Sequence, residues 1–138
     1  MLKLTRSGEY AVKGMIFLAG QPPGQSILIG DIAHQQQVSP SFLAKIFQSL
    51  SGCGLVDSRR GAGGGVSLGK PATDINLRMI IEAVDGPVAL NNCLSTDSPC
   101  TQAGQCPVAG VWRRAQDGMM GVLESCNLAE LARHPTVM

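Results

Sequence analysis

Three cysteines, Cys93, Cys100 and Cys106, lie within fourteen residues of this 138-residue chain. The residues between them are mainly Ser, Thr, Asp, Pro, Gly and Gln, which are typical of a loop rather than of a packed element. Thiolates bind iron–sulfur clusters and zinc, whereas a polar loop has no packing reason to hold three thiols. Neither gap is the two-residue gap of zinc ribbons, so the spacing favours a larger cluster and leaves zinc open.

The other cysteines and both histidines have simpler explanations. Cys53 lies between two glycines that end a helix, and Cys126 continues an apolar stripe as a small buried residue would. His34 and His134 are isolated and are interpreted as surface or capping residues. No Ser/His/Asp or Cys/His combination is apparent, so the sequence predicts that the protein is not an enzyme.

The charges divide unevenly along the chain. Residues 1–70 sum to +4 and residues 71–138 to −3, so the basic front half suits a polyanion such as DNA. No signal peptide is visible, and the apolar part of the first expected helix is too short and interrupted to span a bilayer. We therefore expect a cytoplasmic protein, associated with the nucleoid when bound to DNA, in which thiols stay reduced.

The front half has the pattern of a winged helix-turn-helix. Thr5 suits an N-cap, and Ser39 followed by Pro40 suits the cap and first position of another helix. The elements expected here are helices at residues 5–19, 31–36 and 40–50, a short strand or staple at 27–29, and strands at 55–60 and 66–68.

The third of these helices is the candidate recognition helix, because its polar face can reach base edges and phosphates. Glycines at residues 61–65 would let the tip of the following hairpin enter a minor groove, where arginine is favoured. The hairpin lacks the Gly-Lys-Ser/Thr ending of a phosphate-binding loop. The simpler alternative is a solvated helix beside a flexible hairpin. The predicted DNA contacts are Ser39, Ser41, Lys45, Gln48, Arg59 and Arg60.

The back half predicts two more long helices. One spans residues 74–85 and is ended by Gly86 and Pro87, and the other spans residues 107–126. Asn127 suits the cap of a last short helix that runs through Arg133. The second carries apolar residues at the 4, 3, 4, 3 spacing of a coiled coil, which predicts a homodimer. The alternative is that this stripe packs on its own chain. The predicted seam is Val108, Trp112, Ala115, Met119 and Val122.

These motifs together resemble the bacterial iron–sulfur cluster regulators of the IscR and NsrR type, which are dimeric winged-helix repressors. The resemblance covers nearly the whole chain, and the wing followed by three cysteines is its most specific part. The matching residues are Leu4, Thr5, Gly8, residues 10–12, 39–43, 54–56, 60–65, 68–70 and 80–86, and the three cysteines.

The resemblance implies a cluster bound by Cys93, Cys100 and Cys106 and a variable fourth ligand. In the IscR type that ligand is a histidine three residues after the last cysteine, and here this position is Ala109. In the NsrR type it is a carboxylate of the partner subunit, at the position of Glu9. Asp97 and an external thiol stay open, as does the choice between a 2Fe–2S and a 4Fe–4S cluster.

The sequence thus predicts a fold that is mainly α with a small β-hairpin wing and a long C-terminal dimerisation helix. Its function would be DNA-binding transcription regulation, with the cluster sensing redox state, nitric oxide or iron–sulfur status. The alternatives are a DNA-binding protein with a structural zinc or a thiol switch, and an iron–sulfur electron carrier. The predicted parts are a DNA-binding domain at 1–70, a linker and connecting helix at 71–90, a cluster-binding loop at 91–106, and a dimerisation helix and tail at 107–138.

Overall fold

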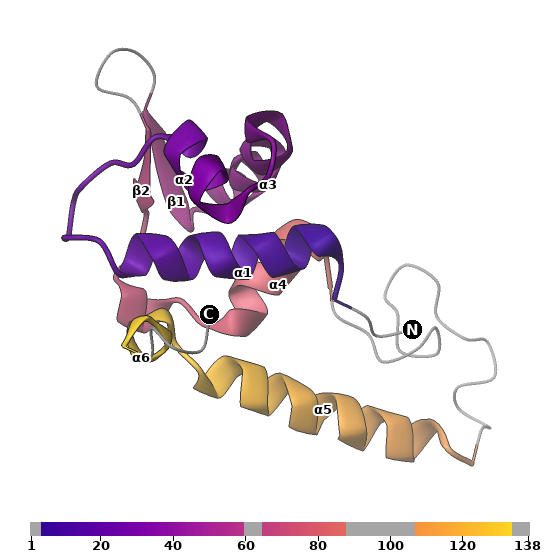
Figure 1. Ribbon diagram of the computed structural model, residues 1–138. Coiled ribbons are helices and arrows are strands. Elements are labelled where there is room, and N and C mark those ends of the chain that lie inside the picture. Colours follow the sequence, from indigo (N-terminus) through magenta and orange to yellow (C-terminus); the bar gives the residue numbers. More distant parts are fainter. Residues whose placement is uncertain (1–3, 60–64, 88–106, 134–138) are drawn as a thin grey trace.

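The computed structural model describes residues 4–59, 65–87 and 107–133 of the chain (Figure 1). These residues form a helical body that carries a two-stranded hairpin, with one long helix running along the side opposite the hairpin. The elements are α1 (Arg6–Ala19), α2 (Ile29–Gln36), α3 (Pro40–Gly52), β1 (Val56–Arg59), β2 (Gly65–Leu68), the 3₁₀ turn η1 (Ala72–Asp74), α4 (Leu77–Asp85), α5 (Ala109–Ser125) and α6 (Leu128–Ala132).

Polar side chains begin the first and third helices by accepting hydrogen bonds from their first free amides. The Thr5 hydroxyl accepts from the Gly8 amide at 3.0 Å, and the Ser39 hydroxyl accepts from the Phe42 amide at 3.2 Å. Pro40 follows at the first helical position, where its missing N–H costs nothing. The predicted starts of the first and third helices are therefore confirmed.

A single apolar core joins the helices to the hairpin. Gly14 of α1 lies so close to α3 that a Cβ atom there would be 3.0 Å from the Phe47 ring. This contact holds one face of α3 against the core and leaves its polar face in solvent. The core side chains include Met15, Leu18, Ile32, Leu43, Ile46, Phe47, Leu50, Val56, Val66, Ile75, Ile80 and Leu128.

The wing is an antiparallel hairpin whose second strand also forms an isolated β-bridge with Ile27. β1 pairs with β2 from Val56 opposite Leu68 to Arg59 opposite Gly65. The Ile27 amide donates to the Val66 carbonyl at 2.9 Å, and the Val66 amide donates back at 2.8 Å. Gly65 has a φ of 136°, and a Cβ there would lie 2.7 Å from the Ile27 carbonyl oxygen, so only glycine fits.

The helix predicted from residue 74 begins instead at Leu77. Residues Ala72–Asp74 form the turn η1, and the next residue, Ile75, is extended and fully buried. The Asn76 side chain then accepts a hydrogen bond from the Met79 amide at 2.9 Å. A residue that caps a helix in this way has extended backbone angles, so the helix cannot run through it.

Asn76→Ala should therefore lower the free energy of unfolding by about 1 kcal/mol, because the first turn of α4 loses its cap. Urea denaturation followed by circular dichroism measures this change. Thr73→Ala, at an exposed position of the preceding turn, should change the free energy of unfolding by no more than about 0.5 kcal/mol. An equal effect of the two substitutions would contradict the capping role of Asn76.

Asn76 also lies where two distant parts of the chain meet. It forms an isolated antiparallel bridge with Asn127, in which the Leu77 amide donates to the Cys126 carbonyl at 3.2 Å. The Leu128 amide donates to the Ile75 carbonyl at 2.9 Å. The two ends of the segment 77–126 are thus joined at the edge of the core.

α5 contacts the body mainly through its C-terminal half (Figure 1). Met120 is 7% exposed, and Arg78 of α4 pairs with both Glu82 and Glu124, which links α4 to α5. These two carboxylates raise the pKa of Arg78, first through the hydrogen bond to Glu82 and then through that to Glu124. A guanidinium is charged at physiological pH with or without this shift, so the charge of the ion pairs does not depend on it.

Cys126 departs from its prediction. It does not continue the apolar stripe of α5 but ends the helix with extended backbone angles, and its side chain is only half-buried. The reason is the bridge at Asn127, which requires an extended chain at this point. Asn127 then accepts from the Glu130 amide at 2.9 Å and begins α6, as predicted.

Candidate functional site

The polar face of α3 is presented to solvent beside the core. Ser39, Ser41, Lys45 and Gln48 are all exposed, whereas the opposite face of the same helix is buried. The Ser39 and Ser41 hydroxyls lie 3.4 Å apart at the helix N-terminus, where free amides and the helix dipole favour a phosphate. The structure thus brings together four of the six predicted DNA contacts on one surface.

A groove of about 650 Å³ runs from this face of α3 to the base of the wing. Lys45 and Gln48 line it from α3, and Ser58 lines it from β1. Ala44 and Ser51 also line it, and the sequence analysis did not single them out. Their spacing of three or four residues from Gln48 is the signal that could have found them, because such residues share a helix face.

The wing carries Arg59 at the end of β1, where the side chain is exposed. Arg60 and the glycines at residues 61–64 lie outside the described residues. The structure therefore places one of the two predicted wing arginines, at the outer end of the first strand of the hairpin. The DNA contacts of both arginines stay predictions.

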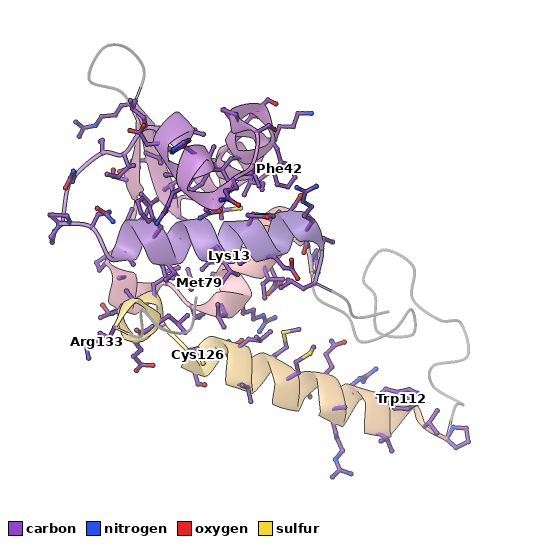
Figure 2. All side chains as sticks on the ribbon, viewed as in Figure 1. Lys13, Phe42, Met79, Trp112, Cys126 and Arg133 are labelled. Carbon is purple, nitrogen blue, oxygen red and sulfur yellow. The ribbon has the colours of Figure 1, made fainter. Side chains whose placement is uncertain are left out.

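A cluster of cations and aromatic rings on α1 borders the recognition helix. The Arg6 guanidinium lies 5.0 Å from the centre of the Phe42 ring of α3, and 5.7 Å from that of Tyr10. The Tyr10 and Phe42 rings meet edge to face at 5.8 Å, and Lys13 lies 5.2 Å from the Tyr10 ring centre. Figure 2 labels Lys13 on α1 and Phe42 on α3. Cation–π contacts of this kind are attractive, so they tie the start of α1 to the first turn of α3.

The predicted cluster ligands Cys93, Cys100 and Cys106 lie outside the described residues, as does Asp97. Cys53 is exposed at the end of α3 and Cys126 is half-buried, and both are free thiols. Across residues 4–59, 65–87 and 107–133, no group of three or more His, Cys, Asp or Glu side chains could hold a metal ion. The assignment of the three cysteines and Glu9 as cluster ligands stays a prediction.

Glu9, the fourth ligand implied by the resemblance, is exposed in the first turn of α1. Its amide donates to the Thr5 carbonyl at 2.9 Å, as in a regular helix. Within the described part of the chain, the Glu9 carboxylate makes no ion pair. The carboxylate is thus accessible to a ligand from outside its own helix.

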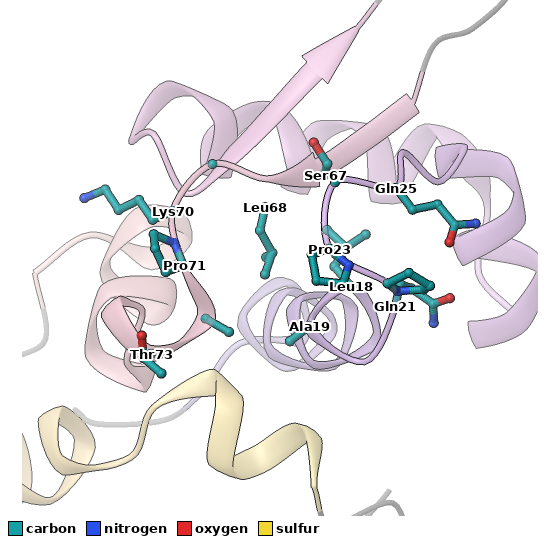
Figure 3. A pocket seen from close by; sticks show the side chains of 14 residues that line it. Leu18, Ala19, Gln21, Pro23, Gln25, Ser67, Leu68, Lys70, Pro71 and Thr73 are labelled. Carbon is teal, nitrogen blue, oxygen red and sulfur yellow. The ribbon is translucent and has the colours of Figure 1, made fainter.

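A second hollow, of about 500 Å³, lies between the turn after α1 and the segment that follows β2 (Figure 3). Leu18, Ala19 and Leu68 form apolar walls, and Lys70 is the one charged side chain among its lining residues. The lining contains no cysteine, histidine or carboxylate, so it offers none of the usual side-chain ligands of iron or zinc.

Comparison with known proteins decides the family. The model of the Rrf2 family, described as an iron-dependent transcriptional regulator, matches residues 4–134. The chain belongs to the Rrf2 family. It is 35% identical over 137 residues to the HTH-type transcriptional regulator IscR of Photorhabdus laumondii, covering 99% of this chain and 83% of that one. The identity to IscR of Escherichia coli is 34%, covering 99% of this chain and 84% of the relative.

Solved structures of other proteins share the fold. CymR of B. subtilis, titled the global cysteine regulator, superposes with a TM-score of 0.79 at 30% identity, covering 97% of this chain and 98% of that one. IscR of T. potens superposes with a TM-score of 0.72 at 28% identity, covering 96% and 87%. The predicted winged-helix architecture is thereby confirmed, and this Rrf2-family protein is a DNA-binding transcription regulator rather than an enzyme.

The described helices of this Rrf2-family protein include none that is both long enough and apolar enough to cross a membrane.

Proposed function

We propose that this regulator is a homodimer whose affinity for DNA depends on an iron–sulfur cluster. The observation that carries the proposal is the place of the three cysteines. They lie in the one segment that connects α4, which packs on α1 and α3, to α5, which extends away from the body. A ligand bound in this segment can act on the DNA-binding body and on the long helix at once.

Cys93, Cys100 and Cys106 would hold the cluster through their thiolates, and Glu9 of the partner subunit would supply the fourth ligand. A cluster held in this way would supply iron that reacts with oxidants and with nitric oxide. The description of the family as iron-dependent supports an iron-containing group over zinc. The cluster would change the affinity for DNA only to the extent that the protein binds the cluster with different affinities in its DNA-binding state and in its other state.

Four segments of the chain would have different functions. Residues 1–70 bind DNA, residues 71–90 connect, residues 91–106 hold the cluster, and residues 107–138 pair two subunits. The exposed side chains of α5 support pairing, since Val108, Val111, Trp112 and Val122 are 44%, 54%, 38% and 64% exposed on one side of this helix. A second copy of the chain is the occupant that would bury the same stripe on both partners.

Anaerobic purification tests the cluster directly. We expect a coloured protein that contains iron and sulfide in similar amounts, and a DNA affinity that changes when the cluster is removed. A colourless protein with stoichiometric zinc would favour the structural-zinc alternative. A protein with a reversible redox potential and no affinity for DNA would favour an electron carrier.

The wing makes a further prediction. Replacing Arg59 and Arg60 together by Ala should weaken DNA binding and reduce the slope of log affinity against log salt by about 0.9 for each phosphate that is no longer neutralised. Replacing Arg113 and Arg114 of α5 removes the same charge at exposed positions away from α3 (Figure 1) and should leave the slope unchanged. The wing assignment is wrong if the two double variants behave alike in a binding titration across salt concentrations.

A further inference from the structure

The last residue of α4 reaches back to the start of α1. The Thr5 hydroxyl donates a hydrogen bond to the Asp85 carboxylate at 2.6 Å, across 80 residues of sequence. The same hydroxyl accepts from the Gly8 amide, so Thr5 caps α1 and holds Asp85 with one atom. The carboxylate thereby lies at the positive end of the α1 dipole, where a negative charge is favoured.

The fit around this hydrogen bond is close. A Cβ atom added at Gly8 would lie 2.7 Å from the second carboxylate oxygen of Asp85 and 2.8 Å from the Leu4 side chain. Gly8 is buried although its helix begins at the surface. The end of α4 and the first turn of α1 therefore touch without room for a methyl group.

On its other side, the chain after Asp85 leads directly into the cysteine-containing segment. Gly86 has a φ of 80°, a left-handed conformation that favours glycine, and its amide still donates to the Glu82 carbonyl at 3.0 Å. Pro87 follows and restricts the backbone further. Only Gly86 and Pro87 separate Asp85 from residue 88, so the segment that contains the cysteines begins three residues after Asp85.

The start of α1 is in turn bound to the recognition helix. Arg6, next to Thr5, stacks on Phe42 in the first turn of α3, and Phe42 follows the predicted DNA contacts Ser39 and Ser41. A hollow of about 300 Å³ lies where α1, α3 and α4 meet, with Thr5, Phe42, Lys45 and Asp85 in its wall. The three helices thus share one junction beside the surface expected to bind DNA.

We propose that Thr5 and Asp85 are positioning residues, which set the N-terminal turn of the recognition helix and transmit the state of the cysteine-containing segment to it. The transmission half of this proposal rests on the proposed function, whereas the positioning half does not. Neither residue needs to touch DNA or the cluster. Breaking their hydrogen bond should leave the cluster and the fold in place and remove the communication between the cluster and α3.

The test is Asp85→Ala in the full-length protein, with Asp74→Ala as the matched control. Asp74 is an exposed carboxylate of η1 whose side chain makes no ion pair within the described residues, so both changes remove one charge from the same half of the chain. For each variant, iron and sulfide content are measured, and DNA affinity is titrated with and without the cluster. Amide hydrogen exchange is followed across α3.

We expect Asp85→Ala to bind a full cluster and to exchange the amides of the first turn of α3 faster than the unmodified protein. The ratio of the DNA affinity with the cluster to the DNA affinity without it should move toward one by about fivefold or more. A change of this size is within the usual range of coupling between sites. Thr5→Val should change the affinity ratio in the same direction. Thr5→Ser, which keeps the hydroxyl, should have the ratio of the unmodified protein. Asp74→Ala should change nothing.

A second pair of variants tests the same hydrogen bond while keeping both Thr5 and Asp85. Gly8→Ala should displace the Asp85 carboxylate and lower the ratio, whereas Gly30→Ala, where an added Cβ meets nothing within 4 Å, should not. An unchanged affinity ratio and unchanged exchange in Asp85→Ala would overturn the proposal. If the unmodified protein itself shows no cluster-dependent affinity, the proposed function fails, and the exchange measurement alone then decides whether Asp85 positions α3.

Discussion

Cys93→Ala, Cys100→Ala and Cys106→Ala are each expected to abolish the visible absorption of the cluster. A cluster with three protein thiolates cannot keep its full coordination when one thiolate becomes a methyl group. Because the three cysteines act as one unit, the single variants should resemble one another and the triple variant. Absorption spectra and iron content of anaerobically purified protein measure the effect.

Cys53→Ala and Cys126→Ala are the controls, and each should keep a full cluster. Both remove a free thiol, one at the exposed end of α3 and one at the end of α5, so they also exclude a general effect of thiol removal. Retention of a full cluster by Cys100→Ala would show that the ligand set has been assigned wrongly. Glu9→Ala should weaken cluster retention without preventing assembly, since three thiolates remain.

The second large effect is expected at α5. Val122→Glu should raise the dissociation constant of the dimer by roughly a hundredfold or more, because the pairing loses a buried valine worth about 1.5–3 kcal/mol and must also desolvate a charge. Specific DNA binding should fall with it, since two recognition helices about 34 Å apart are needed to read a two-fold site. Sedimentation at several protein concentrations, combined with operator titration, measures both.

Val122 gives a cleaner test than Met119 in the same seam. Val122 is 64% exposed in the single chain, so a charge there does not disturb the fold, whereas Met119 is half-buried. Arg114→Glu, an exposed position of α5 outside the seam, is the control and should leave the dimer intact. A Val122→Glu protein that stays dimeric with normal DNA affinity would place the pairing surface elsewhere.

Local signals predicted much of the fold because they act between near neighbours in sequence. Thr5, Ser39 and Asn127 each cap a helix within three residues of themselves, so the pattern of the sequence reveals them. The predicted start of α4 is wrong because Ile75 is extended instead of helical. Its extended conformation comes from the bridge between Asn76 and Asn127, which no local pattern contains.

The candidate site was likewise predicted only where local sequence patterns determine it. The polar face of α3 follows from helical spacing, and the structure finds all four of its predicted residues exposed. The interactions of Arg6 with Phe42 and of Thr5 with Asp85 were not predicted, because each joins residues that are far apart in the chain. On α5 the periodicity predicted an apolar stripe, but only the packing of Met120 against the body shows which side of the helix is left free.

The bridge between Asn76 and Asn127 affects which changes in length and sequence this protein can tolerate. The buried residues Ile75 and Leu128 lie on either side of it, so the chain enters α4 at residue 77 and leaves α5 at residue 126 through one fixed point. The length of the stretch that joins α4 to α5 can therefore vary without moving either end of the segment 77–126. The entropy of closing such a stretch grows slowly, by about 0.6 kcal/mol for each doubling of its length. Insertions, deletions and new ligand sets can be accommodated there at little cost to folding, because the ends of α4 and α5 at this bridge stay in place.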